Sequence, residues 1–222
     1  MKSMQEIEPF AKARKRMVES QIKARGVHDP RVLKVMERVP RHLFISEEMR
    51  PDAYEDHPLP IGFGQTISQP YIVALMTSLL DLKGSEKILE IGTGCGYQAA
   101  ILANLAAEVH TIERIKNLAD SAGVNLASLA LTNIHIHVGD GSLGWPEAAP
   151  YDGILVTAAS PAVPANLIEQ LKTGGKLVIP VGERWRQILE LWIKTSQGIE
   201  KKEILPVVFV PLRGKQGWQD AN

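Results

Sequence analysis

The chain has 222 residues, enough for one α/β domain with appendages and for a sizeable core without disulfides. Its 25 basic and 25 acidic side chains cancel, so the charge does not indicate a nucleic-acid partner, and no apolar run is long enough to span a membrane. The single cysteine, Cys95, excludes an internal disulfide framework, and together with the lack of a signal-peptide pattern it predicts a soluble, cytoplasmic protein.

The first part of the chain, residues 1–56, predicts two helices ahead of any sheet strand. Residues 9–25 are amphipathic, and the basic run 12–16 among them is interpreted as a solvated helix face rather than an RNA contact. Asp29 and Pro30 supply an N-cap and a first-turn proline for a second helix that ends near residue 39. These helices are expected to form an N-terminal appendage.

A long loop rich in proline and glycine lies between Pro51 and Pro70 and leads into a helix at about 71–80. Structureless loops of this length inside compact domains are uncommon and often functional. Residues 62–70, Gly-Phe-Gly-Gln-Thr-Ile-Ser-Gln-Pro, concentrate hydroxyl and amide groups between two glycines and a proline. Composition alone leaves two interpretations open, a plain linker and a functional loop at 57–70.

Beyond this loop, strands and helices alternate. Strands are expected near 87–91, 108–112, 134–138, 152–156 and 175–180, and helices near 97–106, 115–130 and 164–172. The alternation predicts an α/β fold, a doubly wound and mostly parallel Rossmann-like sheet with helices on both faces, within a core at 71–182. Two β-rich runs, 188–194 and 199–210, predict an antiparallel C-terminal hairpin within 183–218. We expect one domain, 1–222.

The segment that follows the first of these strands carries glycine at every second position: Glu90-Ile-Gly-Thr-Gly-Cys-Gly-Tyr97. Glycine lets the backbone approach a ligand closely, and the helix that follows presents unpaired N–H groups. A dinucleotide fingerprint, Gly-x-Gly-x-x-Gly, is not matched, because the third glycine comes one residue early and Tyr97 fills a slot that should be small. The pattern predicts a site for another nucleotide-like ligand.

Acidic residues lie near the ends of three successive predicted strands. Glu90 precedes the glycine turn, where a carboxylate would repel a pyrophosphate but suit an ammonium or sulfonium group. Glu113 lies roughly twenty residues beyond the turn, where it can accept hydrogen bonds from ribose hydroxyls, and Asp140 could accept from an adenine amino group. A phosphate-free adenosyl ligand with a cationic amino-acid end is S-adenosylmethionine. The alternative is a structural turn with chance acids.

Two histidines, His135 and His137, alternate along one predicted strand and so face the same side. Two imidazoles there could suggest a metal, but no third ligand has a recognisable spacing. We expect partly buried structural histidines and no metal. Cys95 is expected to be a small residue tolerated in a tight turn rather than a redox sensor.

From the first helix to about Trp218, the chain resembles the bacterial protein-L-isoaspartate O-methyltransferases. The matching blocks are residues 62–70, above all Gln65-Thr-Ile-Ser-Gln-Pro70, with Glu90-Ile-Gly-Thr-Gly94, Val138-Gly-Asp-Gly141, Ala158-Ala159, Val163-Pro164, the segment 174–182 and Val210-Pro-Leu212. Cys95 replaces the serine often found in that turn, a nearly isosteric change.

The resemblance implies a Rossmann-like methyltransferase. Such an enzyme transfers the methyl group of S-adenosylmethionine to the free α-carboxylate of L-isoaspartyl residues in damaged proteins and peptides, and releases S-adenosylhomocysteine. The ester collapses to a succinimide, whose hydrolysis restores some normal aspartate. We expect a monomer without a metal, with isoaspartyl proteins and peptides, and neither nucleic acid nor membrane, as its partners.

The resemblance also assigns site residues. It makes Ser68 the catalytic residue. The predicted cofactor-binding residues are Gln65, Thr66, Ile67, Glu90, Gly92, Thr93, Gly94, Gly96, Tyr97, Glu113, Arg114, Asp140 and Gly141. The predicted substrate-binding residues are Ile61, Thr66, Ser68 and Val210. A carboxylic acid with a pKa of about 4 is already ionised at neutral pH, so no general base is needed, and no Ser-His-Asp or Cys-His constellation is evident.

The sequence fits three rival functions less well. Many base-amino methyltransferases carry an Asp/Asn-Pro-Pro-Tyr tetrad after the fourth strand, where this chain has Leu155-Val-Thr-Ala-Ala-Ser160. A small-molecule O-methyltransferase would need a metal or a base to activate a weakly acidic hydroxyl. A non-catalytic ligand sensor would have no need of Ser68. We also expect the 57–70 loop to close over the glycine turn as a lid, with Gly62 and Gly64 giving mobility.

Overall fold

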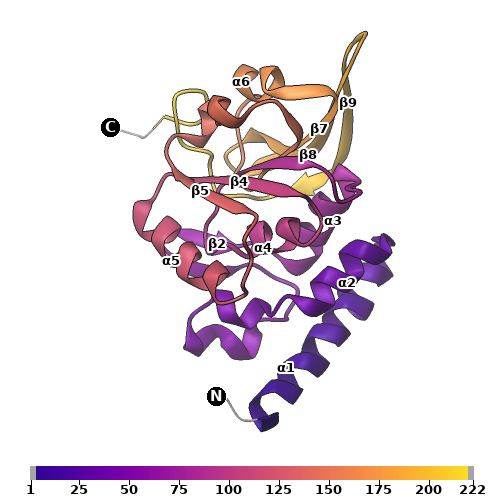
Figure 1. Cartoon of the computed structure of the whole chain (residues 1–222), viewed down its shortest axis with the longest axis vertical. Coiled ribbons are helices and arrows are strands. Elements are labelled where there is room, and N and C mark those ends of the chain that lie inside the picture. The colour runs from indigo at the N-terminus through magenta and orange to yellow at the C-terminus, as the bar shows by residue number, and fades with distance from the viewer. Residues whose placement is uncertain (1–3, 220–222) are drawn as a thin grey trace.

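The computed structural model describes residues 4–219, which form one large sheet, a small hairpin and surrounding helices (Figure 1). The large sheet has the strand order β5-β4-β3-β6-β7-β8-β9. Its strands are β3 (Lys87–Ile91), β4 (Glu108–Glu113), β5 (Ile134–Val138), β6 (Tyr151–Val156), β7 (Leu171–Glu183), β8 (Arg186–Thr195) and β9 (Gly198–Val207). Neighbours from β5 to β7 pair in parallel, and β8 and β9 are antiparallel, as predicted.

Helices cover both faces of the sheet, but unequally (Figure 1). The helices are α1 (Met4–Met17), α2 (Pro30–Arg38), α3 (Pro70–Leu80), α4 (Tyr97–Ala103), α5 (Lys116–Ala127) and α6 (Ala165–Glu169). The first five lie on one side and the short α6 on the other. The second face is completed by the 3₁₀ turns Gly141–Leu143 and Pro146–Ala148 and by the C-terminal segment that contains Leu212.

The N-terminal helices form largely where the sequence predicts them. Asp29 caps α2 by accepting hydrogen bonds from the backbone N–H groups of Arg31 and Val32. The helix expected at 9–25 changes type along its length, since α1 continues as a π turn at Val18–Ile22 and a 3₁₀ turn at Lys23–Arg25. Within the π turn Val18 and Ile22 are both buried.

The expectation of a structureless loop between Pro51 and Pro70 is wrong. This stretch contains the antiparallel hairpin of β1 (Leu59–Gly62) and β2 (Gln65–Ile67). Its turn has three successive residues with positive φ, Gly62 at 89°, Phe63 at 53° and Gly64 at 69°. Glycine adopts such angles without strain, which explains why two of the three turn residues are glycines.

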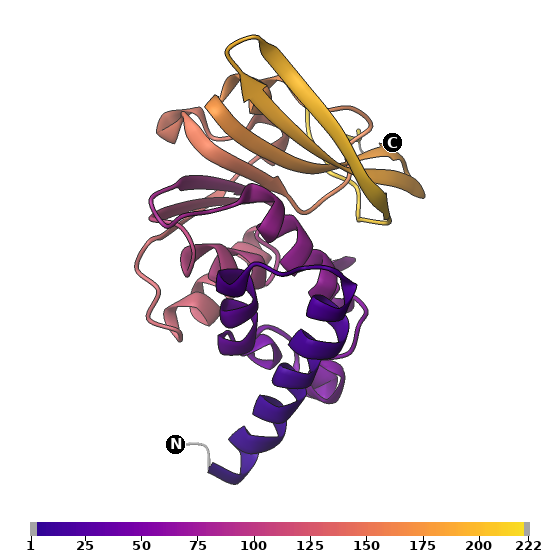
Figure 2. The same ribbon diagram turned by 90° about the vertical axis from the view of Figure 1, so that its right-hand side faces the viewer.

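Two apolar cores lie on the two faces of the sheet. Because side chains alternate along a strand, Ile88 of β3 enters the first core while Leu89 and Ile91 enter the second. Met17 and Met36 of the N-terminal helices belong to the first core, so these helices pack on the sheet domain. Figure 2 shows the N-terminal helices at one end of the molecule and the β8–β9 hairpin at the other. No helix within residues 4–219 is both long and apolar enough to cross a bilayer.

The strand order reverses direction at β3, since β4 lies on one side of it and β6 on the other. In open parallel sheets, ligands bind outside the carboxyl ends of the strands at such a switch point. The fold therefore predicts a ligand site next to Ile91, the last residue of β3.

Candidate functional site

A cleft lies at this switch point, with about 680 Å³ of empty space including the part open to solvent. That size is typical of sites for small molecules and cofactors. Its walls come from the residues after β3, β4 and β6, from the β1–β2 hairpin and from segment 210–213. Eight predicted site residues line it: Gln65, Thr66, Gly92, Gly94, Glu113, Arg114, Gly141 and Val210.

The glycine turn is shaped by its packing against β6. Gly92 has a φ of 96°, and a Cβ atom there would lie 2.3 Å from Oγ1 of Thr157. That hydroxyl donates to the carbonyl oxygens of Ile91 at 3.0 Å and Gly92 at 2.7 Å. Only glycine meets both the angle and the close approach, so the turn exposes bare backbone to the cleft.

Glu113 is buried at the end of β4 and lines the cleft. Its Oε2 accepts the backbone N–H of Gly94 at 2.9 Å, and its Oε1 accepts that of Ile115 at 2.9 Å. A carboxylate oxygen can accept more than one hydrogen bond. Glu113 thus ties the glycine turn to β4 and keeps acceptor capacity for ribose hydroxyls.

Glu90 lies beneath the turn rather than in the cleft. It is fully buried, its Oε2 accepts a hydrogen bond from Thr111 Oγ1 at 2.6 Å, and its Oε1 has no hydrogen-bond partner among residues 4–219. Burial, with a smaller contribution from the charge of Glu113, raises the pKa of Glu90 to about 8, despite the Thr111 hydrogen bond. Burial therefore favours the neutral form of Glu90 at neutral pH, and its contact with a cationic ligand stays a prediction.

Asp140 lies beside the cleft, where its carboxylate holds the C-terminal segment. Oδ1 accepts from the backbone N–H and hydroxyl of Ser142, at 3.0 and 2.6 Å, and Oδ2 accepts from the backbone N–H of Lys215 at 2.8 Å. Burial opposes ionisation, but these hydrogen bonds outweigh it and lower the pKa of Asp140. The adenine contact stays a prediction for this residue, while Gly141 lines the cleft directly.

A second, larger groove adjoins the cleft and contains Ser68, the predicted catalytic residue. The two spaces share four lining residues: Thr66, Thr157, Val210 and Pro211. Ser68 is half-buried, and its hydroxyl makes no hydrogen bond within residues 4–219. A molecule in the groove and one in the cleft would meet near these shared residues, beside a free hydroxyl donor.

Other predicted site residues have their side chains away from both spaces. Tyr97 is buried in the first core, where its hydroxyl donates to Met36 Sδ at 3.9 Å and its ring packs on Phe44. Ile67 is buried as well, and the Thr93 hydroxyl contacts that of Thr111 at 2.6 Å. Gly96 packs against Leu126 of α5. The side chains of Tyr97, Ile67 and Thr93 therefore line neither the cleft nor the groove.

Ile61, predicted to bind substrate, supports the turn from the hairpin side. A Cβ atom on Gly94 would lie 3.2 Å from Ile61 Cδ1, so the hairpin packs directly on the glycine turn. Ile61 also lines a separate pocket, which Cys95 shares.

Sequence reasoning missed several residues around the two spaces. Thr157 follows the last residue of β6, and its place after a predicted strand was the signal that could have identified it. Residues 184–186 line the groove from the turn between β7 and β8. No sequence signal marked that turn, because its residues are far from Ser68 in the sequence and come near it only in the folded protein.

Comparisons with known proteins agree with this geometry. The model of the family described as protein-L-isoaspartate(D-aspartate) O-methyltransferase matches residues 12–217. Protein-L-isoaspartate O-methyltransferase 1 of Syntrophobacter fumaroxidans is 56% identical over 210 residues, which cover 95% of this chain and 98% of the relative. The protein-L-isoaspartate O-methyltransferase of Trichlorobacter lovleyi is 57% identical over 211 residues, which cover 95% and 97%.

A solved structure is also similar along most of its length. It is described as a protein-L-isoaspartate O-methyltransferase from Plasmodium falciparum in complex with S-adenosyl-L-homocysteine. It superposes with a TM-score of 0.79 at 29% identity, over 90% of this chain and 98% of that one. Together with the family match over residues 12–217, these similarities show that the chain belongs to the protein-L-isoaspartate(D-aspartate) O-methyltransferase family.

Proposed function

We propose that this protein transfers the methyl group of S-adenosylmethionine to the free α-carboxylate of L-isoaspartyl residues in damaged proteins and peptides. One structural observation supports the proposal independently of the family relationship. The cleft at the switch point and the groove that contains Ser68 meet at Thr66, Thr157, Val210 and Pro211. Donor and acceptor can therefore be held in separate spaces that open onto one point.

The cleft residues suit an adenosyl ligand that carries no phosphate. Glu113 would accept hydrogen bonds from the ribose hydroxyls, and the bare backbone of the glycine turn would let the amino-acid end approach closely. When bound, the cofactor supplies a methyl group on a sulfonium centre. Burial favours the neutral form of Glu90, whereas Glu113 and the backbone dipoles of the turn lie at the wall of the cleft and would face this ligand.

The acceptor side needs orientation more than activation. An isoaspartyl α-carboxylate is already ionised at neutral pH, so no general base is required. The Ser68 hydroxyl donates one hydrogen bond to the carboxylate and orients the second oxygen toward the methyl group without neutralising the anion. Reaction then depends on in-line alignment and on exclusion of water by the hairpin.

The test uses methyl-labelled S-adenosylmethionine with matched peptides that contain isoaspartate or aspartate. We expect base-labile label on the isoaspartyl peptide alone. Ser68→Ala should lower kcat/KM by roughly tenfold to a hundredfold, because one orienting hydrogen bond contributes about 1–3 kcal/mol. Ser85→Ala, which changes an exposed loop serine, is the matched control and should keep full activity. Equal labelling of both peptides would contradict the substrate assignment, and an unaltered Ser68→Ala enzyme would contradict the role of Ser68.

We propose further that the enzyme works as a monomer in the cytoplasm. The balanced charge and the single buried cysteine support this proposal, since neither favours a membrane surface, a nucleic acid or a disulfide-linked assembly. Light scattering during size-exclusion chromatography should give the mass of one chain, 24.4 kDa. A stable mass of twice that value would contradict it.

A further inference from the structure

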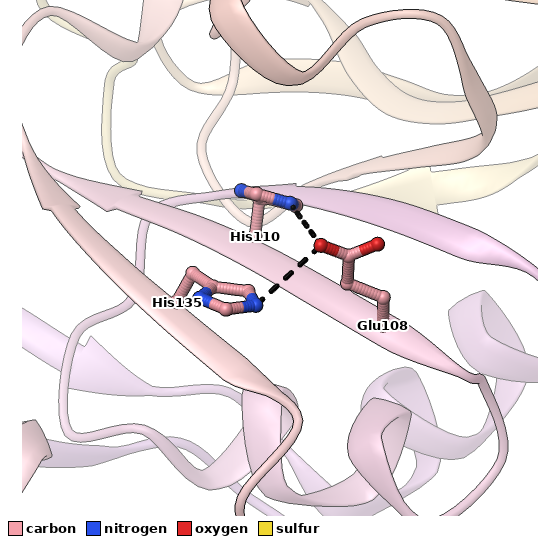
Figure 3. Close-up of side chains that lie close together, drawn as sticks. All are labelled: Glu108, His110 and His135. Atoms are coloured by element: carbon pink, nitrogen blue, oxygen red, sulfur yellow. Dashed lines mark hydrogen bonds and ion pairs between the residues drawn. The ribbon is translucent and has the colours of Figure 1, made fainter.

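A cluster of nitrogen and oxygen donors lies on β4 and the edge strand β5, away from both the cleft and the groove (Figure 3). It consists of Glu108, His110 and His135. Glu108 is the first residue of β4 and Glu113 the last, so along the strand Glu108 lies roughly 16 Å, and His110 roughly 10 Å, from Glu113 in the wall of the cofactor cleft. No residue of the proposed methyl transfer belongs to it.

The donor atoms of the cluster converge on one point. Nε2 of His110 lies 3.0 Å from Oε1 of Glu108, and Nε2 of His135 lies 3.4 Å from the same oxygen. Figure 3 shows both imidazole rings directing a nitrogen at this oxygen from neighbouring strands. Tetrahedral donors at bond lengths of about 2.0–2.1 Å lie about 3.3 Å apart. The two nitrogen–oxygen distances are already close to this separation.

A movement of the more exposed histidine, His135, can bring the two imidazole nitrogens closer together. All three donor atoms lie within 4.8 Å of one another, so the two nitrogens have to approach by about 1.5 Å at most for tetrahedral coordination. The His135 side chain is 51% exposed and stacks by one face on the His110 ring, whereas that of His110 is only 9% exposed. Glu108 is 43% exposed, which leaves an open path from solvent.

The surroundings orient the buried ligand as metal sites require. A ligating histidine usually donates its other ring N–H to an acceptor that fixes the ring. Nδ1 of His110 lies 3.0 Å from Nε2 of His137, which can accept that hydrogen bond. The His137 ring is in turn stacked on Trp145 at 4.0 Å, and Tyr151 packs edge-on against His110. His110 is thus held by contacts on two sides.

From this geometry we propose that Glu108, His110 and His135 bind one divalent transition-metal ion of the Zn²⁺ type, with His137 as a positioning residue. Two imidazoles and one carboxylate are donors that Zn²⁺ prefers, and the fourth position is left to water. The ion would join β5 to β4 at the edge of the sheet. The sequence showed no third ligand beside His135 and His137, because residues 108 and 110 become neighbours of residue 135 only through strand pairing, where His110 is the register partner of His135.

The test is calorimetric titration of the tag-free full-length chain with ZnCl₂ at pH 7.5, without cofactor. We expect one ion bound per chain. His135→Gln and Glu108→Gln should each weaken binding by more than tenfold, and His137→Gln by about tenfold, as for other outer-shell partners. Co²⁺ should give the visible absorption of a four-coordinate site in the wild type and lose it in His135→Gln.

His28→Gln, which replaces an exposed histidine on the loop before α2, is the matched control and should bind Zn²⁺ like the wild type. Circular dichroism and methyl-transfer activity report whether each variant is folded; because His135 is half exposed, its replacement should preserve both. Absence of Zn²⁺ binding, or equal affinity in the wild type and His135→Gln, would overturn the proposal. Mg²⁺ binding as tight as Zn²⁺ binding would also overturn it, since imidazole donors disfavour Mg²⁺.

Discussion

Glu90 shows how burial can change the chemistry that a residue type suggests. Its position before the glycine turn suggests a charge facing a cationic ligand, but its side chain is enclosed beneath the turn. Only the Thr111 hydroxyl donates to it within residues 4–219, and one oxygen has no partner. A carboxylate with so few donors in a dry environment favours its neutral form. Glu90 therefore lies in surroundings that favour its neutral form, and its contact with the cofactor stays a prediction.

This interpretation predicts a pH-dependent stability difference for Glu90→Gln. The folded-state pKa of Glu90 is raised to about 8 from the ordinary value of 4.5, so the folded protein retains a proton that the unfolded chain releases. The free energy of unfolding of the wild type therefore loses up to about 1.4 kcal/mol per pH unit between these two pH values, on account of this group. Glutamine does not titrate, so the variant should gain stability relative to the wild type as pH rises. Urea unfolding of both proteins at pH 5, 6.5 and 8 measures the difference in the free energy of unfolding. A difference that is the same at all three pH values would contradict the prediction.

Gly92 gives a second prediction at the residue scale. In Gly92→Ala the new Cβ atom would meet Thr157 Oγ1 at 2.3 Å, at a φ of 96° that L-residues avoid. The turn must move, so we expect a loss of about 1–3 kcal/mol in the free energy of unfolding and at least tenfold weaker binding of S-adenosylhomocysteine. Gly139→Ala is the control, because a Cβ atom there has nothing within 4 Å and its φ is not positive. Titration calorimetry measures the affinity of both variants for S-adenosylhomocysteine. Equal affinities in Gly92→Ala and Gly139→Ala would show that the turn tolerates a side chain.

Among the elements, the β1–β2 hairpin is the one most directly placed to respond to the cofactor. Gln65 and Thr66 line the cleft, and Ile61 packs on the glycine turn. We expect S-adenosylhomocysteine to slow amide hydrogen exchange across residues 61–68 by about tenfold, since a ligand in the cleft would add contacts to one side of the hairpin. The turn between β8 and β9 is the internal control, because it lies outside both spaces and should exchange at the same rate. Unchanged exchange at 61–68 would contradict a closing hairpin.

Element type was largely predictable from the sequence, whereas side-chain direction was not. The mostly apolar run of β3 and the alternation of apolar residues with histidine in β5 gave both strands their observed bounds. The β1–β2 hairpin was missed because Phe63 takes a positive φ that its residue type does not suggest. The strand β7 spans Leu171–Glu183 rather than the expected 175–180, and β9 ends at Val207 rather than at residue 210.

The site was predictable to the same degree. Its place at the carboxyl ends of the strands follows from the alternation of strands and helices. Glu113 lines the cleft, as its spacing from the glycine turn predicted. Glu113 is the last residue of β4, whereas Glu90 is the last residue but one of β3. The Glu90 side chain is therefore buried in the interior and not in the wall of the cleft. The tie between Asp140 and Lys215 could not be inferred, because those residues are far apart in the chain and only the folded C-terminal segment joins them.

In the whole molecule, function depends on bringing distant segments to one place. The β1–β2 hairpin supplies Thr66 and is followed directly by Ser68, β6 is followed by Thr157, and the segment after β9 supplies Val210 and Pro211. That last segment is held to the end of β6, since Ala159 donates to the Val210 carbonyl at 2.8 Å and Leu212 donates to the Ala159 carbonyl at 2.7 Å. The junction of cleft and groove is therefore built on backbone hydrogen bonds, which fixes its geometry more firmly than side-chain contacts would.

The far wall of the groove predicts how a peptide is held beyond its reacting carboxylate. Trp185, in the turn between β7 and β8, is 76% exposed and lines the groove together with Val208, which is 70% exposed. Exposed aromatic residues beside a concave site commonly anchor a partner chain. Trp185→Ala should raise the KM for an isoaspartyl hexapeptide about threefold to tenfold, and leave the KM for S-adenosylmethionine unchanged, because Trp185 does not line the cofactor cleft.

Val124→Ala is the matched control for that substitution. It truncates a side chain that is 73% exposed on α5, outside the groove, and should change neither constant. Initial rates at varied peptide and varied cofactor separate the two effects. A shorter peptide that cannot reach the β7–β8 turn should lose the difference between the wild type and Trp185→Ala. If both enzymes treat the hexapeptide alike, or if the KM for S-adenosylmethionine rises instead, the peptide does not extend along this wall.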